Sequence, residues 1–65
     1  MLKTYSFYFR DGPGGMSSFE PVMCVGEVEL MEKARVALAG RPDFGGLDVF
    51  FGDTELLRLK QGGAG

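Results

Sequence analysis

The amino-acid sequence predicts a two-layer α+β domain in which one helix covers one face of a four-stranded antiparallel sheet. Three observations lead to this prediction. Residues 3–10 alternate between apolar and polar side chains, as a half-buried strand does. Residues 27–39 repeat apolar side chains at the spacing of one helix face. Residues 47–60 contain two more strand-like segments separated by a short turn sequence.

Length and composition restrict the class of protein. The chain has 65 residues, and a chain of this size buries only about 60% of the surface that its unfolded form exposes. Residues 1–60 are therefore expected to form a single domain of marginal stability, for which self-association is a natural means of stabilisation. The tail of residues 61–65, QGGAG, is expected to be disordered because it has no side chain to pack.

The residue types exclude several kinds of chemistry. Cys24 is the only cysteine and histidine is absent, which removes Ser-His-Asp and Cys-His nucleophiles and the common nitrogen and sulfur metal sites. We therefore expect no enzymatic activity and no cofactor. The net charge of -2 is too small to indicate a nucleic-acid partner by itself. No segment resembles a secretion signal or approaches the roughly 20 apolar residues of a membrane helix, so we expect a cytoplasmic protein that does not bind membranes.

The first strand runs into a glycine-rich loop. Its apolar side carries three aromatic residues, Tyr5, Phe7 and Phe9. Residues 11–18, DGPGGMSS, are typical of a turn. A phosphate-binding loop would direct its amides at an anion from the start of a helix, whereas here a second strand is expected at residues 19–25. The loop is therefore predicted to be a turn.

The second strand contains a proline. Pro21 has no N–H to donate to a neighbouring strand. We therefore expect this strand at an edge of the sheet, or its pairing to start only after Pro21. The sequence leaves open whether residues 19–25 form a full strand.

The helix of residues 27–39 has recognisable start and end signals. Glu27 and Glu29 lie in its first turn, where the helix dipole favours negative charge. Gly40 supplies a C-terminal cap and Pro42 prevents the helix from continuing.

The register of the last two strands can be predicted from their side chains. A two-residue loop of Gly52 and Asp53 would place Arg58 on the apolar side of the hairpin. A three-residue loop, residues 52–54, instead gives an apolar face and an opposite-charge cross-strand pair. This preferred register pairs Val49 with Leu57, Leu47 with Leu59, and Asp48 with Arg58.

The elements are expected to assemble around the aromatic first strand. A right-handed crossover through the helix favours strand order 2-1-3-4, while the order 2-1-4-3 stays open. The expected core joins sheet residues to helix residues. From the sheet it takes Tyr5, Phe7, Phe9, Leu47, Val49, Phe51, Leu57 and Leu59, and from the helix Leu30, Met31, Ala34 and Leu38.

The other face of this sheet is the candidate interaction site, because no second helix is predicted to cover it. The interface residues expected there are Tyr8, Arg10, Phe50, Leu56 and Arg58. An exposed apolar patch with a polar rim marks an interaction site more often than not. We expect a homodimer formed through this face or through an edge strand, or else binding to another protein.

Single-stranded nucleic acid is the alternative partner for the same face. Tyr8 and Phe50 are suited to stack on bases while nearby arginine and lysine side chains hold the backbone. The position of Asp48 in the middle of the face and the net negative charge of the chain disfavour this alternative.

The remaining polar residues have ordinary structural explanations. Carboxylates act in acid–base catalysis or bind hard metals only where they converge in a pocket, and a small two-layer domain offers little concavity. The carboxylates considered are Asp11 with Glu20, and Asp43, Asp48 and Asp53. Cys24 has only glutamates near it in the sequence, and these raise the pKa of a thiol. It is therefore predicted to be a packing residue, either buried or on an edge strand.

Three segments together resemble a family of short bacterial proteins of unassigned function. They are YSFYFRDG, ELMEKARVALA and LDVFFGDTELLRL, about half of the chain. The family has an aromatic opening strand ending in Arg-Asp-Gly, a helix rich in alanine, arginine and leucine, and a closing strand pair. The segment PGGMSSFEPVMCV departs from the family, which tends to be acidic there. The resemblance implies the same fold and no particular activity.

Overall fold

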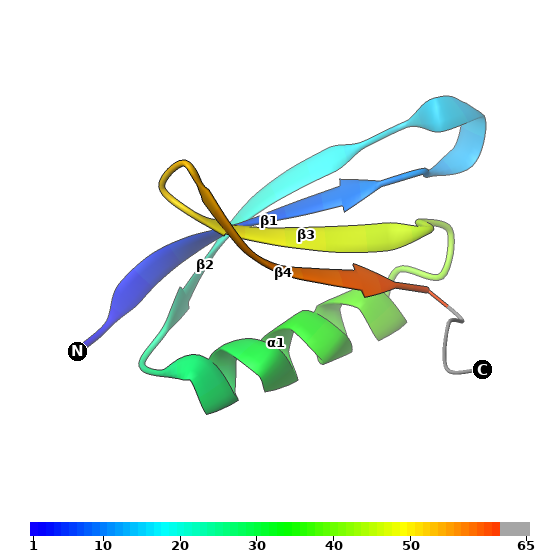
Figure 1. Ribbon diagram of the computed structural model, residues 1–65. Helices are drawn as coiled ribbons and strands as arrows, with labels where there is room; N and C mark the ends of the chain where they lie inside the picture. The colour runs from blue at the N-terminus through cyan, green and yellow to red at the C-terminus, as the bar shows by residue number, and fades with distance from the viewer. Residues whose placement is uncertain (62–65) are drawn as a thin grey trace.

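The computed structural model describes residues 1–61 of the chain. Four strands of this part form one antiparallel sheet, and a single α-helix packs on one face (Figure 1). The elements are β1 (Lys3–Arg10), β2 (Ser18–Cys24), α1 (Glu27–Ala39), β3 (Gly46–Phe51) and β4 (Thr54–Lys60). The strand order is β2-β1-β3-β4. The predicted fold class and the favoured strand order are therefore confirmed, and the order 2-1-4-3 is ruled out.

Strand β1 supplies the centre of the core. Phe7 and Phe9 are fully buried and Tyr5 nearly so, while the residues between them are not. This alternation follows from the strand geometry, because successive side chains point to opposite faces of the sheet. Since β1 pairs with β2 on one side and β3 on the other, its aromatic side lies at the middle of the layer that α1 covers.

Strand β2 is an edge strand, as its proline predicted. Its pairing with β1 extends from Cys24, opposite Lys3, to Ser18, opposite Phe9. Pro21 lies within this ladder, opposite Ser6. The segment is thus a full strand paired on both sides of the proline, which an edge position tolerates because one side of the strand needs no donors.

Helix α1 buries one narrow stripe. Leu30, Ala34 and Leu38 recur every four residues and are the buried members of the helix. At its start, the Glu29 carboxylate accepts a hydrogen bond of 2.6 Å from the backbone N–H of Val25, which satisfies a donor just before the first turn. One helix lies across one face of a small twisted sheet (Figure 1), and beside the stripe Ala37 is partly buried against the core.

Two residues expected in the core are exposed. Met31 is 40% exposed because it lies one position from Leu30, about 100° around the helix from the buried stripe. Phe51 is 43% exposed at the end of β3, where its ring lies beside Tyr5, with 5.3 Å between ring centroids, and beneath Nζ of Lys3 at 5.4 Å from the ring centroid. The prediction that these two side chains are buried is wrong.

The connector after α1 adds a core residue that the sequence did not indicate. Phe44 is buried and its ring lies 5.7 Å from that of Phe9. The same ring packs on the backbone of Gly12, where a Cβ atom would lie 2.7 Å from Cε1 of Phe44. Glycine at position 12 is therefore required by this close approach.

The closing hairpin has the predicted pairing but not the predicted loop. Leu47 lies opposite Leu59, Asp48 opposite Arg58, and Val49 opposite Leu57. However, β3 ends at Phe51 and β4 begins at Thr54, so the loop has two residues, Gly52 and Asp53, with Gly52 at a φ of 64°. The extra residue is absorbed by a β-bulge, because the next pair after Val49 and Leu57 is Phe50 and Glu55.

The bulge changes which face Leu56 occupies. It places Leu56 and Leu57 on the same side of β4, and both line a hollow beside Leu30 and Met31 of α1. The prediction that Leu56 lies on the face opposite the helix is therefore wrong. Glu55 takes that place, opposite Phe50.

The end of the described chain is anchored to the helix terminus. The side-chain amide of Gln61 donates to the carbonyl oxygens of Leu38 at 2.7 Å and Arg41 at 3.0 Å. Gln61 was expected to begin a disordered tail, whereas these bonds hold it against two carbonyls at the end of the helix that also accept backbone N–H groups, from Arg41 and Phe44. The remainder of that predicted tail, residues 62–65, lies outside the described residues.

The open face of the sheet as the candidate site

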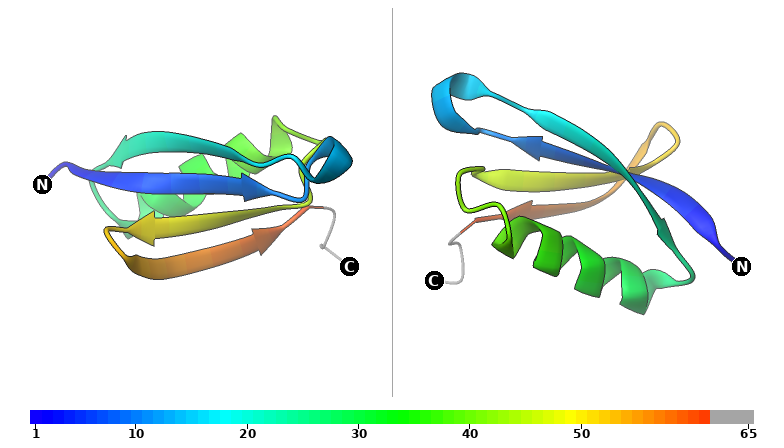
Figure 2. Two further views of the ribbon diagram at one scale, coloured as in Figure 1. Left: turned by 90° about the horizontal axis from the view of Figure 1, so that it is seen from above. Right: turned by 180° about the vertical axis from the view of Figure 1, so that it is seen from behind.

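The candidate site is the face of the sheet opposite α1, which we call the open face. Figure 2 (left) looks onto the sheet with α1 behind it. The strand register brings side chains from all four described strands onto this face. They are Phe19, Pro21 and Met23 from β2, Thr4, Ser6, Tyr8 and Arg10 from β1, Asp48 and Phe50 from β3, and Glu55, Arg58 and Lys60 from β4.

One half of the open face is apolar. Tyr8 lies directly opposite Phe19, which is 61% exposed. Ser6 has Pro21 on one side and Phe50 on the other. Directly opposed residues on one face of a sheet touch, so these side chains form a continuous patch. With Met23 they constitute the apolar half, which consists of Tyr8, Phe19, Pro21, Met23 and Phe50.

Sequence reasoning found Tyr8 and Phe50 and missed the contribution of β2. The signal was present, because Phe19, Pro21 and Met23 alternate with Glu20, Val22 and Cys24. The alternation alone does not say which set of β2 residues lies on the open face. The glycine-rich loop before β2 does not determine which β2 residue pairs with Tyr8. Only the pairing of Phe19 with Tyr8 decides it.

The other half of the open face consists of paired charges, Arg10, Asp48, Glu55 and Arg58, which we call the ionic half. The Asp48 side chain is 9% exposed and lies between Nε of Arg10 at 3.2 Å and Nε of Arg58 at 3.3 Å. Arg58 also contacts Glu55 at 3.2 Å. The hydrogen bond to Asp48 raises the pKa of Arg10, against an opposing effect of burial. The predicted cross-strand pair of Asp48 and Arg58 is thus part of a larger cluster.

Gly46 allows Arg10 to take its position in this cluster. The two residues lie opposite each other on β1 and β3, and a Cβ atom on Gly46 would lie 2.6 Å from Cζ of Arg10. Without that atom, the guanidinium lies flat across β3 and reaches the carbonyl oxygen of Leu59 at 3.4 Å as well as Asp48. The position of Arg10 therefore depends on a glycine in the neighbouring strand.

The ionic half lowers the support for the nucleic-acid alternative. Arg10 and Arg58, the two arginines of the predicted base-stacking platform, both contact Asp48. A phosphate group would have to compete with a nearly buried carboxylate for each of them. The site residues Tyr8, Arg10, Phe50 and Arg58 do lie on one face as predicted, and the arrangement of their charges favours a partner without strong net charge.

Both edges of the sheet are poorly suited to accept another strand. On β2, Pro21 has no N–H, and a proline in a paired strand turns its nitrogen toward the unpaired edge. Backbone groups of alternate residues point to the same edge, so the Met23 carbonyl belongs to that row, and it accepts a hydrogen bond of 2.8 Å from Nζ of Lys33. On β4, the bulge at Leu56 interrupts the outer edge. Prolines, lysines and bulges are the devices by which proteins prevent edge-to-edge pairing.

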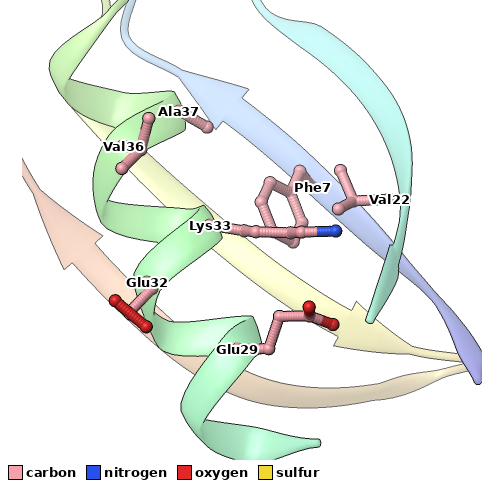
Figure 3. A pocket seen from close by; sticks show the side chains of 7 residues that line it. All are labelled: Phe7, Val22, Glu29, Glu32, Lys33, Val36 and Ala37. Atoms are coloured by element: carbon pink, nitrogen blue, oxygen red, sulfur yellow. The ribbon is translucent and has the colours of Figure 1, made fainter. Parts of the chain in front are cut away.

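A hollow lies between α1 and β2 on the helix side of the sheet. It has a volume of about 420 Å³ and an apolar floor that includes Phe7 and Val22. Figure 3 shows the Lys33 side chain extending from α1 past Phe7 toward β2. Lys33 is bound to the Met23 carbonyl and Glu29 to the Val25 amide, so two of the three charged side chains that line the hollow, the third being Glu32, have structural partners.

The other candidate groups are dispersed. Asp11 contacts Arg10, whereas Glu20 contacts Arg41 at 3.2 Å on the helix side, so these two carboxylates do not converge. Burial raises the pKa of the Cys24 thiol, and the thiol lies in the core as predicted. Within residues 1–61 no three histidine, cysteine or acidic side chains are placed to hold a metal ion.

The glycine-rich loop uses its amides internally. The N–H of Gly12 donates to the Met16 carbonyl at 2.8 Å, and the N–H of Gly15 donates to the Gly12 carbonyl at 2.9 Å. Amides directed at their own loop cannot also converge on an anion. The segment is a turn between β1 and β2, as predicted.

No family model, curated protein or solved structure matches the chain. In the part of the chain that the structure describes, no helix is long and apolar enough to cross a membrane. The fold and the site together define a small two-layer α+β domain whose sheet presents one apolar and one charge-paired half. The function proposed below rests on that geometry.

Proposed function

We propose that this protein is a non-catalytic interaction module that self-associates by packing the open face of one copy on that of another. The apolar half carries the proposal. Tyr8 and Phe19 are exposed and lie directly opposite each other across the ladder of β1 and β2, and the exposed Met23 lies further along β2, opposite Thr4. A monomer of this size rarely exposes a continuous patch of large apolar side chains, and where one occurs it usually mediates binding.

A second copy suits the open face better than a strongly charged partner. In the ionic half each positive side chain contacts a negative one, so the face carries little net charge. Two such faces approach without strong repulsion, and burial of Phe19 and its neighbours stabilises the pair by about 25 cal/mol for each Å² of apolar surface removed from water. A small domain gains most from such burial because its own core is limited.

Packing through the face is favoured over pairing through an edge strand. Edge pairing needs an uninterrupted row of backbone donors and acceptors. Pro21 and the bonded carbonyl of Met23 interrupt that row on β2, and the bulge at Leu56 interrupts it on β4. The open face has no comparable obstacle.

The oligomeric state tests this proposal. Sedimentation velocity and light scattering at micromolar concentration should give the mass of a dimer for the wild-type chain. Phe50→Glu and Phe19→Glu should each shift the protein to a monomer while leaving the far-ultraviolet circular dichroism unchanged. Val28→Glu is the matched control, because Val28 is a strongly exposed apolar residue on α1, away from the open face.

Three outcomes would contradict the proposal in different ways. A wild-type monomer would remove self-association altogether. A dimer that tolerates both glutamate substitutions would place the interface elsewhere. Salt-dependent binding of a single-stranded oligonucleotide that is lost in Arg58→Glu would instead support the nucleic-acid alternative.

A further inference from the structure

Building on the self-association proposed above, we infer that the two copies are related by a two-fold axis that runs across the strands. In this arrangement each strand of one copy lies over the same strand of the other, in the opposite direction. Residue Arg58 of each copy then faces Glu55 of the other. The inference follows from the division of the open face into an apolar half and an ionic half.

The strand register arranges the open face in rows. One row runs from Phe19 through Tyr8 and Asp48 to Arg58. The next row runs from Pro21 through Ser6 and Phe50 to Glu55. The apolar half occupies the β2 end of both rows and the ionic half the β4 end, as can be followed from the strand positions in Figure 2.

A face-to-face dimer with two-fold symmetry has two simple arrangements. With the axis parallel to the strands, β2 of one copy covers β4 of the other, so Phe19 would lie on Arg58 and Pro21 on Glu55. Apolar side chains would then remove water from charged groups without offering them hydrogen bonds, which is unfavourable. With the axis across the strands, β2 lies over β2 and β4 over β4, so Phe19 meets apolar Pro21 and Arg58 meets Glu55, and Phe50 is the apolar side chain that meets charged groups.

The charges fix the position of the axis along the strands. Arg58 and Glu55 lie on the same strand in adjacent rows and have opposite sign. An axis midway between the two rows places Arg58 of each copy over Glu55 of the other. The dimer therefore has two equivalent Arg58–Glu55 pairs between the chains, in addition to the pair within each chain. Such an isologous contact is self-complementary, as two-fold symmetry requires.

The same axis gives acceptable neighbours to the other side chains. Phe19 faces Pro21 of the second copy, and Tyr8 faces Ser6 of the second copy. Phe50 faces the site of Asp48, where the guanidinium groups of Arg10 and Arg58 lie beside the carboxylate and accept an aromatic ring. Packed sheets lie about 10 Å apart, and their strands cross at about 30°. The side chains of Arg58 and Glu55 are long enough to meet across this separation and to follow the shift that the crossing angle causes.

The test uses two variants whose ionic halves carry opposite charge. Glu55→Arg places two arginines on β4, and Arg58→Glu places two glutamates there. Each variant alone should dimerise at least tenfold more weakly than the wild type, because like charges face each other. An equimolar mixture should restore the dimer, and native mass spectrometry of the mixture should show predominantly the heterodimer.

A second variant pair protects the test against misfolding. Arg58→Glu puts an extra carboxylate beside Asp48 and is expected to destabilise the fold. Arg58→Gln avoids this, and its mixture with Glu55→Arg should still favour the heterodimer, because the homodimer of Glu55→Arg places arginine against arginine. Circular dichroism of each variant establishes that it is folded.

The outcomes separate this inference from the proposal on which it rests. A wild-type monomer contradicts the self-association proposal itself. A wild-type dimer that Phe19→Glu dissociates, but whose charge variants mix in statistical proportions, retains the open-face dimer and overturns the axis across the strands. Preference for the heterodimer without sensitivity to Phe19→Glu would assign the contact to the β4 edge and also overturn the inference.

Discussion

Removal of the charge of Asp48 is expected to cost the domain a large part of its stability. The Asp48 side chain is nearly buried between two arginines. The contact with Arg58 contributes less than about 1 kcal/mol, because that side chain is 61% exposed and solvent screens it. The contact with Arg10, which is 24% exposed, is a hydrogen bond between charged groups, and such bonds contribute about 1.5–3 kcal/mol. Since asparagine keeps one acceptor, we expect Asp48→Asn to lower the free energy of unfolding by about 2 kcal/mol.

Urea and thermal unfolding, followed by circular dichroism, measure this loss. A change of about 2 kcal/mol corresponds to a fall in Tm of about 8–16 °C for a domain of this size. Protein concentration must be held constant, because self-association makes the Tm depend on it. Asp53→Asn is the control, since Asp53 is an exposed acid in the β3–β4 loop, and its effect should stay within about 0.5 kcal/mol. A loss for Asp48→Asn no larger than that of the control would refute this account of the ionic half.

The pH dependence of the same contact has a definite sign. Because the bond to Asp48 raises the pKa of Arg10, the folded state holds that proton more tightly than the unfolded state. The resulting stabilisation is fully present below the ordinary pKa of a guanidinium and is lost only as the pH rises through the higher value of the folded state. The titration of Arg10 should therefore cause no change, between neutral and mildly alkaline pH, in the difference in free energy of unfolding between the wild type and Asp48→Asn.

Two further predictions concern Gly46 and Cys24. Gly46→Ala should lower the free energy of unfolding by about 1–2 kcal/mol, because the added Cβ atom displaces Arg10 from Asp48. If both substitutions act through the contact between Arg10 and Asp48, the double variant should lose little more stability than Asp48→Asn alone. Additive losses would contradict this shared mechanism. Cys24 should react with a thiol reagent only at denaturant concentrations that unfold the chain, and rapid labelling of the native protein would show that its burial is incomplete. Because burial raises the pKa of this thiol, the wild type should also lose stability relative to Cys24→Ala as the pH rises above the ordinary pKa of a thiol.

Much of the fold was predictable because local patterns and global topology agree. The aromatic alternation of β1 predicted the buried set Tyr5, Phe7 and Phe9. The register of β3 and β4 was predictable because the wrong register would have put Arg58 among apolar side chains. Strand order followed from the handedness of the crossover and from the proline in β2.

The candidate site was predictable only in part. Tyr8, Arg10, Phe50 and Arg58 were assigned to the open face by counting along strands whose phase was known. Leu56 was misassigned because a two-residue loop with a bulge and a three-residue loop give the same pairing for Val49 and Leu57. A bulge leaves no local sequence signal here, since Leu56 and Leu57 are chemically identical side chains.

Apart from the extent of β2, the secondary structure could be predicted from the sequence, as could the central position of β1 and most of the apolar layer under α1, because each follows from side-chain periodicity and from the position of proline and glycine. The composition of the open face, in contrast, depends on how the strands pair. The contribution of β2 to the apolar half depends on the pairing of Phe19 with Tyr8 across the glycine-rich loop between β1 and β2. The position of Arg10 depends on the missing Cβ atom of Gly46, 36 residues away in the chain, and local patterns do not encode contacts between strands that far apart.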